Sequence, residues 1–326
     1  MRFKIDNAYL KDSMVLGAKL EGEGPISKYI DYIGEFKDSS FENSEIDMLT
    51  QSIDMLKERL DLKDSDIDLA IGGELSNQLT TTSYTLRKSL ISLIGIYSAC
   101  STISLGLGLA GLLLNRDDIN NILVFTSSHN QSAERQFRNP VEYGAPKKKT
   151  ATFTATGSAS LILTHEKTDI KVESSTIGKV IDLGQKDVNH MGAVMAPAAA
   201  DTIYRHLRDL KREPDYYDLI LTGDLGLYGK SILQNYINKR YNIVLGKNYN
   251  DCGTMLYNLD TQPVFAGGSG PVCSALVIFS YILKQMKSGK LKRVLIVPTG
   301  AIFSPTWTFQ KETIPAIAHA VSLEVV

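Results

Sequence analysis

The sequence predicts an α/β fold built from two duplicated halves, and three observations lead to this prediction. Apolar strand-type runs alternate with helix-type segments along all 326 residues, as in α/β proteins. A Cys-Ser pair occurs twice inside long uncharged stretches, at Cys100 and at Cys273. A strand-type segment that starts with Asp-Leu also occurs twice, at 68–75 and 218–225. Because these repeats are far longer than the roughly 20–50 residues of a solenoid unit, they indicate two equivalent halves.

The expected elements follow in the same order in both halves. An amphipathic helix is expected at 44–60, before the first Asp-Leu strand, and another at 197–210, before the second. Each Cys-Ser pair then opens an apolar helix, which leads through a polar turn into an apolar strand, at 122–125 and at 294–297. Strands without polar alternation are typical of a sheet covered on both faces, so we expect a largely parallel sheet in each half.

A short polar segment at 165–169 marks the expected boundary between the halves. The first half is predicted to comprise residues 1–165, and the second half residues 166–326. No long linker or low-complexity segment separates them in the sequence. We therefore expect the halves to pack tightly and not to swing as independent domains.

Charge and cysteine content exclude several functional classes. The formal net charge is −1, and no basic stripe runs along the chain, so a nucleic-acid partner is not expected. The three cysteines are widely spaced, which argues against a disulfide framework and against a cysteine-based metal centre. Such cysteine usage fits a reducing compartment. The N-terminus lacks the apolar core of a signal peptide, and nothing in the sequence indicates a cofactor.

Two uncharged stretches, 89–115 and 261–283, are long enough to raise the question of a membrane span. Several glycines interrupt the first stretch, which is also rich in Ser and Thr. The second carries a Gly-rich turn followed by Pro271. Because such residues break a spanning helix, we expect buried helices in place of transmembrane segments.

Two short motifs connect these halves to a known superfamily. Ala99-Cys100-Ser101 resembles the nucleophile motif of thiolases and of ketoacyl synthase III, and Gly157-Ser158-Ala159 resembles the turn that closes the first half of those enzymes. The resemblance implies a thiolase-like, five-layered αβαβα fold. It also implies a homodimer.

Longer blocks resemble one family within that superfamily, the stage V sporulation protein AD family. The resemblance runs from about residue 68 to the C-terminus, and its blocks are 126–130, 133–138, 142–144, 195–203, 251–253, 265–270 and 311–315. It implies a protein of spore formation that binds dipicolinic acid (pyridine-2,6-dicarboxylate) in a site derived from the thiolase cleft. It further implies help with uptake of this acid into the developing spore, beside membrane-embedded SpoVA proteins. The expected place is the forespore or spore, peripheral at the inner spore membrane. Whether Ca²⁺ accompanies the ligand stays open.

Cys100 is the first candidate site residue. The positive end of a helix dipole favours a thiolate at a helix N-terminus, but the sulfur becomes a nucleophile only with a nearby base, and a buried, inert cysteine is the alternative. Condensing relatives also need a His where this chain has Asp224, and a His or Asn near 267–269, where this chain has neither. Those groups take up the thiol proton or stabilise an oxyanion. An ionised carboxylate destabilises an oxyanion, because both are negatively charged. We therefore expect Cys100 to be a vestigial nucleophile and the chain to have no catalytic residue.

Two alternatives remain open at this point. One is a Cys-dependent acyltransferase or ketoacyl synthase III-like enzyme that uses Cys100. The other is a structural subunit whose cleft has no ligand.

The candidate ligand-binding residues are chosen for a planar dicarboxylate. Arg135 and Arg138 stand three apart, so they share a helix face, and two guanidinium groups can each bind one carboxylate. Pairing with neighbouring acidic residues is the alternative for both. His129 follows a strand end, where ligands of α/β sheets bind. The full expected set is Cys100, Ser101, His129, Arg135, Arg138, Asp224 and His319.

Two of the remaining assignments have structural alternatives. His319 lies in an apolar setting that also suits a hydrogen-bonded core histidine. Glu74 and Asp224 occupy equivalent repeat positions and could hold Ca²⁺, but such residues more often cap helices, so no metal site is predicted.

Overall fold

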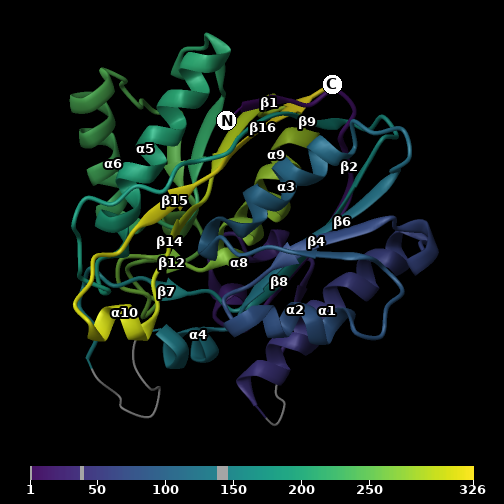
Figure 1. Ribbon diagram of the computed structural model, residues 1–326, viewed down its shortest axis with the longest axis horizontal. Coiled ribbons are helices and arrows are strands. Elements are labelled where there is room, and N and C mark those ends of the chain that lie inside the picture. The colour runs from purple at the N-terminus through teal and green to yellow at the C-terminus, as the bar shows by residue number, and fades with distance from the viewer. Residues whose placement is uncertain (1, 37–39, 138–145) are drawn as a thin grey trace.

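The computed structural model describes residues 2–36, 40–137 and 146–326 of the chain. These residues form one 12-stranded mixed sheet, two small two-stranded sheets and the helices that cover them (Figure 1).

The first half supplies eight strands and four helices among the described residues. The strands are β1 (Arg2–Lys4), β2 (Tyr9–Gly17), β3 (Tyr32–Ile33), β4 (Leu69–Gly73), β5 (Leu93–Gly95), β6 (Asn121–Ser128), β7 (Phe153–Thr154) and β8 (Gly157–Thr164). The helices are α1 (Phe41–Leu60), α2 (Thr80–Leu86), α3 (Thr102–Leu113) and α4 (Asn130–Phe137).

The second half repeats this plan. Its strands are β9 (Ile170–Thr176), β10 (Leu219–Thr222), β11 (Tyr249–Asp251), β12 (Gly268–Ser269), β13 (Arg293–Val297), β14 (Thr299–Ala301), β15 (Ala316–Ala318) and β16 (Ala320–Val325). Its helices are α5 (Met191–Leu210), α6 (Gly226–Tyr241), α7 (Cys252–Met255), α8 (Pro271–Leu276), α9 (Leu283–Lys287) and α10 (Pro305–Phe309). A π-helical segment, Val277–Ile282, joins α8 to α9.

The strand order confirms the duplicated α/β fold. The first half runs β5-β4-β6-β8-β2 and the second β11-β10-β13-β16-β9, so each strand has a counterpart at the same place. The two halves of the large sheet meet where Tyr9 of β2 pairs with Lys171 of β9. In each half the first two pairings are parallel and the next two antiparallel. The prediction of a largely parallel sheet is therefore wrong for half of the pairings, because continuous apolar runs report burial on both faces and not strand direction.

The helices form three layers around the two halves of the sheet. Figure 1 shows α5 and α6 on one outer face, α1 and α2 on the other, and α3 with α8 and α9 between the sheets. Helix α3 contacts β4 and β6 of the first half and β9 and β16 of the second. This is the αβαβα arrangement that the resemblance implied.

Close packing of α3 explains the first uncharged stretch. A Cβ atom at Gly106 would lie 2.9 Å from a Val124 methyl group in the first-half sheet, and one at Gly108 would lie 2.4 Å from Ser175 Oγ in the second. These glycines let both sheets approach one helix, as buried packing requires. Among the described residues, no helix is long and apolar enough to cross a membrane.

Two outer helices begin earlier than the sequence indicates. Helix α1 starts at Phe41 because the Ser40 hydroxyl accepts a hydrogen bond from the Asn43 amide (3.1 Å). Helix α5 starts at Met191 and contains Pro197, whereas proline usually opens a helix. Buried apolar side chains on its first turns, including Met195, pack into the second-half core and hold the longer helix.

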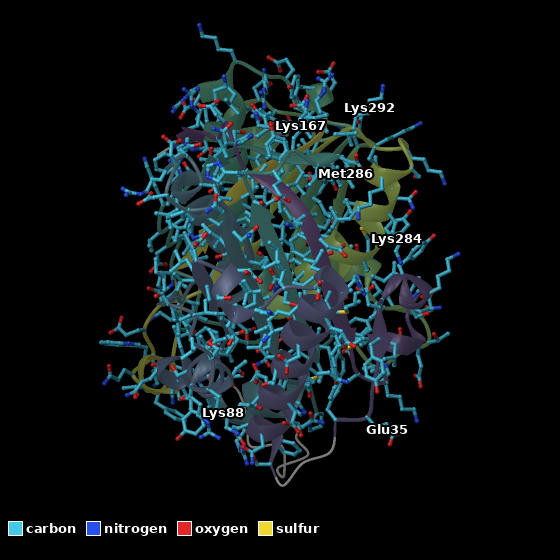
Figure 2. The ribbon with its side chains drawn as sticks, turned by 90° about the vertical axis from the view of Figure 1, so that its right-hand side faces the viewer. Glu35, Lys88, Lys167, Lys284, Met286 and Lys292 are labelled. Carbon is cyan, nitrogen blue, oxygen red and sulfur yellow. The ribbon has the colours of Figure 1, made fainter. Side chains whose placement is uncertain are left out.

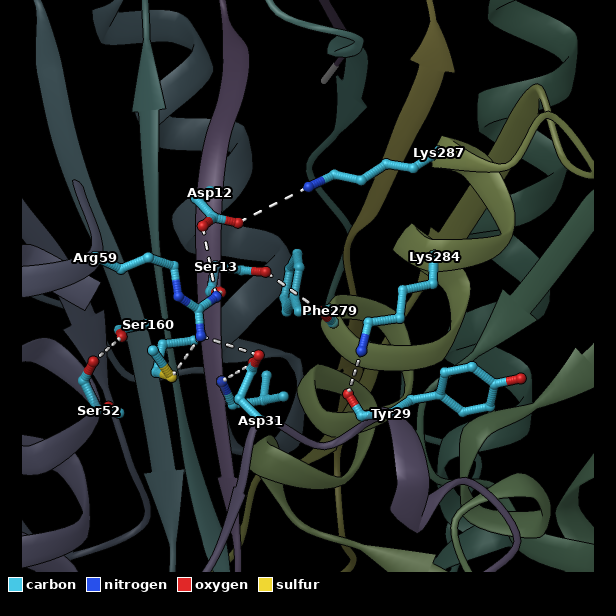
Figure 3. Close-up of polar contacts among 12 residues, drawn as sticks. Asp12, Ser13, Tyr29, Asp31, Ser52, Arg59, Ser160, Phe279, Lys284 and Lys287 are labelled. Carbon is cyan, nitrogen blue, oxygen red and sulfur yellow. Dashed lines mark hydrogen bonds and ion pairs between the residues drawn. The ribbon is translucent and has the colours of Figure 1, made fainter. Parts of the chain in front are cut away.

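Polar contacts tie the central helices to the first half. In Figure 3 the Arg59 guanidinium lies between Asp12 (3.5 Å) and Asp31 (3.1 Å), and Lys287 of α9 approaches Asp12 (3.8 Å). Figure 2 shows this side of the molecule, where Lys284 reaches the surface while Met286 of the same helix is fully buried. The halves thus share the central cluster of buried hydrophobic residues and a polar seam at its edge.

Candidate functional site

A narrow pocket lies where the two halves meet, with a cavity volume of about 40 Å³. Its elements β7, β12, α4 and the region before α10 gather at one end of the central helices (Figure 1). The described lining residues are Leu75, Tyr97, Ala99, Cys100, Ala133, Phe137, Thr154, Met191, Met195, Ser269, Gly270, Ala301 and Phe303.

A tight turn before α3 presents Cys100 to the pocket. Ala99 has a left-handed backbone (φ 47°), which costs a non-glycine residue free energy and is typical of functional turns. The second half packs directly beneath this turn. A Cβ atom at Gly300 of β14 would lie 2.4 Å from the Ser98 carbonyl oxygen, so glycine is required there. The position of Cys100 therefore depends on both halves.

The Cys100 thiol lies against a carboxyl group. Burial and then the negative charge of Asp224, to which the thiol donates a hydrogen bond, raise the pKa of Cys100 well above its usual range. The Gly270 amide and the Ser269 hydroxyl, whose oxygen lies 4.0 Å from the sulfur, act in the opposite direction but are weaker. The helix start alone would favour a thiolate. Burial and a neighbouring carboxylate outweigh the helix dipole.

Asp224 follows β10 and is 1% exposed. Its Oδ1 accepts from the Thr299 hydroxyl (2.6 Å) and its Oδ2 from the Ser269 hydroxyl (3.1 Å). Burial raises the pKa of Asp224 to about 7, although these hydroxyls and Cys100 stabilise the charged form. A carboxyl group, a hydroxyl and a thiol therefore lie together at this end of the pocket.

Ser101 and His319 lie under the Cys100 turn, and neither lines the pocket. His319 Nδ1 accepts from the Gly178 amide (3.2 Å), so its Nε2 carries the proton and donates to Ser98 Oγ (2.9 Å). Burial lowers the pKa of His319 to about 4. The Ser101 hydroxyl donates to the Ser98 carbonyl (2.7 Å). Both residues hold the turn in place from below, and a ligand role for them stays a prediction.

His129 and Arg135 are not among the lining residues of the pocket. The His129 ring stacks on Phe41 (5.4 Å between centroids), and burial lowers the pKa of His129 to about 4. The Arg135 guanidinium lies over the same ring and pairs with Glu42 of α1. Arg135 therefore pairs with an acidic residue, which was the alternative to a ligand role. The partner, Glu42, is one that the sequence did not indicate. Arg138 lies outside the described residues.

The pocket walls were not anticipated from the sequence. Aromatic and sulfur-containing side chains form them: Tyr97, Phe137, Phe303, Met191 and Met195. No charged side chain lines the pocket within residues 2–36, 40–137 and 146–326. Only the position of Phe303 just after the second-half strand end could have indicated a wall, because strand ends face ligand sites.

The two carboxylates considered for Ca²⁺ have separate partners. Glu74 accepts from the Ser76 and Thr82 hydroxyls, whereas Asp224 accepts from Thr299 and Ser269. Throughout the described part of the chain, no group of three or more His, Cys, Asp or Glu side chains is arranged to hold a metal ion.

Comparison with known proteins places this fold and pocket in a family. The family model described as "Stage V sporulation protein AD (SpoVAD)" matches residues 2–324. The chain is 44% identical to stage V sporulation protein AD of Bacillus subtilis (strain 168) over 307 residues, which cover 93% of this chain and 90% of that one.

Solved structures of condensing-enzyme type show the same fold. The 3-oxoacyl-[acyl-carrier-protein] synthase III of Aquifex aeolicus VF5 has a TM-score of 0.56 at 13% identity, covering 97% of this chain and 99% of the other. A variant of OleA from Xanthomonas campestris has a TM-score of 0.63 at 12% identity, covering 99% of both chains. At these identities the likeness concerns the fold alone. The chain belongs to the stage V sporulation protein AD family, a family of sporulation proteins, and has the thiolase-like fold of ketoacyl synthase III and OleA.

Proposed function

We propose that this protein is a non-catalytic binding protein of spore formation that takes up dipicolinic acid in the Cys100 pocket. It assists transfer of this acid into the developing spore together with membrane-embedded SpoVA proteins. Its place is peripheral, at the inner membrane of the forespore or spore.

The observation that carries the non-catalytic part is the pairing of the Cys100 thiol with Asp224. A nucleophilic cysteine needs a base that removes its proton and donors that stabilise an oxyanion. Here the neighbouring carboxyl group raises the pKa of the thiol, and the Ser269 hydroxyl already donates to that carboxyl group. Such a group retains the thiol proton and repels an oxyanion.

A dianionic ligand requires positive charge or donated hydrogen atoms near its carboxylates. Arg135 lies on α4, which contributes Ala133 and Phe137 to the pocket, and its side chain leaves the opposite side of the helix, towards Glu42. We place Arg135 in the ligand site by exchange: a ligand carboxylate competes with Glu42 for the guanidinium. Arg138, three residues further along, stays in the proposal as the second cation.

Calorimetric titration of the purified protein with dipicolinic acid tests the ligand. We expect saturable binding, weakened about tenfold in Arg135→Ala, since a charge-assisted pair contributes on the order of 1–3 kcal/mol. Arg116→Ala is the matched control, because Arg116 is exposed and pairs with Asp118 away from the pocket. Absence of heat with dipicolinic acid, together with absence of any competition by pyridine-2-carboxylate, would refute dipicolinic acid as the ligand.

Incubation with acyl-CoA followed by intact-mass measurement tests the non-catalytic part. We expect no adduct at any acyl chain length. An adduct that disappears in Cys100→Ala would establish the acyltransferase alternative.

We also propose a homodimer formed through the free edge of the first-half sheet. Among the described residues, strand β5 is the last strand of the sheet on that side, and its Leu93 and Ile94 side chains are 38% and 40% exposed. Unpaired edges with apolar side chains favour strand pairing between chains. Light scattering coupled to size exclusion should give a dimer for the wild type and a monomer for Ile94→Lys. A wild-type monomer at micromolar concentration would contradict this assembly.

A further inference from the structure

Two phenylalanine rings, one from each half, meet at the pocket. Phe137 ends α4, and Phe303 lies between β14 and α10. Their ring centroids are 5.7 Å apart, and their planes are tilted by 54°. Both rings line the pocket that contains Cys100. Both are half-buried, so each keeps some ring surface for another contact.

The wall formed by α5 is apolar and adaptable. Met191 and Met195 are 5% and 1% exposed and stand four residues apart, on one face of the helix. Both line the pocket. Methionine thioethers are polarisable and make favourable contacts with aromatic rings. This wall therefore suits the face or edge of a flat ring.

Two polar groups of the pocket, on Cys100 and Ser269, are already engaged. The Cys100 thiol and the Ser269 hydroxyl both donate to Asp224. Burial raises the pKa of the Tyr97 phenol to about 12, so Tyr97 is neutral. With the thiol and serine hydrogen atoms in use and no charged side chain on the described lining, the shape and aromatic character of the walls contribute most to which ligand fits.

We propose that Phe137 and Phe303 form an aromatic clamp that makes the pocket selective for planar aromatic acids over saturated acids with the same carboxylate positions. This inference rests on the proposed function, which concerns the carboxylates of the ligand. It adds a requirement for the aromatic ring that carries those carboxylates. Aromatic faces prefer offset or tilted partners at centroid distances of about 4.5–7 Å, which the Phe137–Phe303 geometry offers to a third ring.

Three ligands distinguish the contribution of the aromatic ring to binding from that of the carboxylates. Pyridine-2,6-dicarboxylate and benzene-1,3-dicarboxylate are flat and aromatic, whereas cis-cyclohexane-1,3-dicarboxylate carries its carboxylates at the same positions of a saturated ring. Calorimetric titration of the wild type should give an affinity about fivefold to tenfold higher for at least one aromatic acid than for the saturated acid. Phe303→Leu keeps an apolar side chain but removes the ring, so it should lower the affinity for the aromatic acid several-fold and leave the saturated acid unchanged.

Phe309→Leu is the matched control, because Phe309 is 84% exposed on α10 and does not line the pocket. It should leave all affinities unchanged. Phe137→Leu repeats the test from the other half, and thermal melts establish that the variants are folded.

The outcomes separate the clamp from the proposed ligand. Binding of benzene-1,3-dicarboxylate without binding of pyridine-2,6-dicarboxylate sinks the proposed ligand and keeps the clamp. Equal affinity for flat and saturated acids, or equal loss of both in Phe303→Leu, overturns the clamp while the proposed ligand stands. Absence of binding by either aromatic acid overturns both.

Discussion

The Cys100 thiol donates a hydrogen bond to the buried carboxyl group of Asp224, and this contact joins the two halves of the molecule at the pocket base. In the sequence the two residues lie in different halves, at the start of the first central helix and at the end of β10. The contact raises the pKa of the thiol, where a nucleophile needs the opposite. The fold of a condensing enzyme is thus combined with a sulfur held in its protonated form.

Alkylation kinetics should report this contact directly. We expect iodoacetamide to modify wild-type Cys100 slowly at pH 8, and at a rate that still rises above pH 9, because the thiolate is scarce. Asp224→Asn removes the negative charge and should speed modification at pH 8 about tenfold, the effect of one pKa unit. Cys100→Ala should take up no label, since Cys252 and Cys273 are fully buried. Rapid wild-type labelling at pH 7 would show that Cys100 is an activated thiolate.

Glu45 should make the protein less stable as the pH rises. It is 3% exposed, and burial followed by the charge of Glu74 raises the pKa of Glu45 to about 8 from 4.5. The folded state therefore holds a proton that the unfolded state releases, so the free energy of unfolding falls between about pH 4.5 and pH 8. Glu45→Gln keeps an acceptor for Ser127 and should be more stable than the wild type at pH 8 by about 1–4 kcal/mol.

Urea unfolding at several pH values from 5 to 8 measures this slope. Glu58→Gln, an exposed change on the same helix α1, should keep the wild-type slope. An unchanged slope in Glu45→Gln would mean that Glu45 is ionised in the folded protein.

His319 should make the protein less stable as the pH falls. Burial lowers the pKa of His319 to about 4, below its usual 6.5, so the unfolded state takes up a proton that the folded state excludes. This contribution to stability is lost as the pH falls from 6.5 towards 4. His319→Gln should cost about 1–2 kcal/mol at pH 7, because one of two hydrogen bonds is lost. Between pH 7 and pH 5, the free energy of unfolding should then fall less in His319→Gln than in the wild type. An equal fall in both proteins would mean that another group causes the acid sensitivity.

Gly300→Ala should displace the turn that carries Cys100. The added Cβ would lie 2.4 Å from the Ser98 carbonyl oxygen, a contact that backbone movement alone can relieve. We expect a stability loss of about 1–3 kcal/mol and weaker ligand binding. Gly246→Ala is the control, since its nearest neighbour would be an Asn248 side-chain atom at 3.7 Å. Unchanged melting and binding in Gly300→Ala would show that the turn tolerates movement.

The duplicated architecture was predictable because the same local sequence patterns occur in both halves. The Cys-Ser pairs, the Asp-Leu strands and the apolar helices recur in the same order, and β4 and β10 occupy equivalent places in the sheet. Glycines such as Gly106 also indicated correctly that an uncharged stretch is buried between sheets. Strand direction was not predictable, because covered strands of either direction have the same apolar pattern.

The chemistry of the site was harder to predict from the sequence, because it depends on contacts between segments that are far apart in the chain. The approach of Asp224 reverses the expected effect of the helix start on Cys100. Glu42 of α1 pairs with Arg135, although nothing local links them. Phe137 and Phe303 come from different halves and become neighbours only in the folded chain. Side-chain partners across a core are set by tertiary packing, which a single sequence does not display.

A crystal structure of the protein soaked with dipicolinic acid tests the central claim most directly. We predict a flat ring in the pocket against Phe137 and Phe303, with the Cys100 sulfur unmodified and still beside Asp224. A ligand bound elsewhere at full occupancy, or a covalent adduct on Cys100, would contradict a non-catalytic binding pocket at this site.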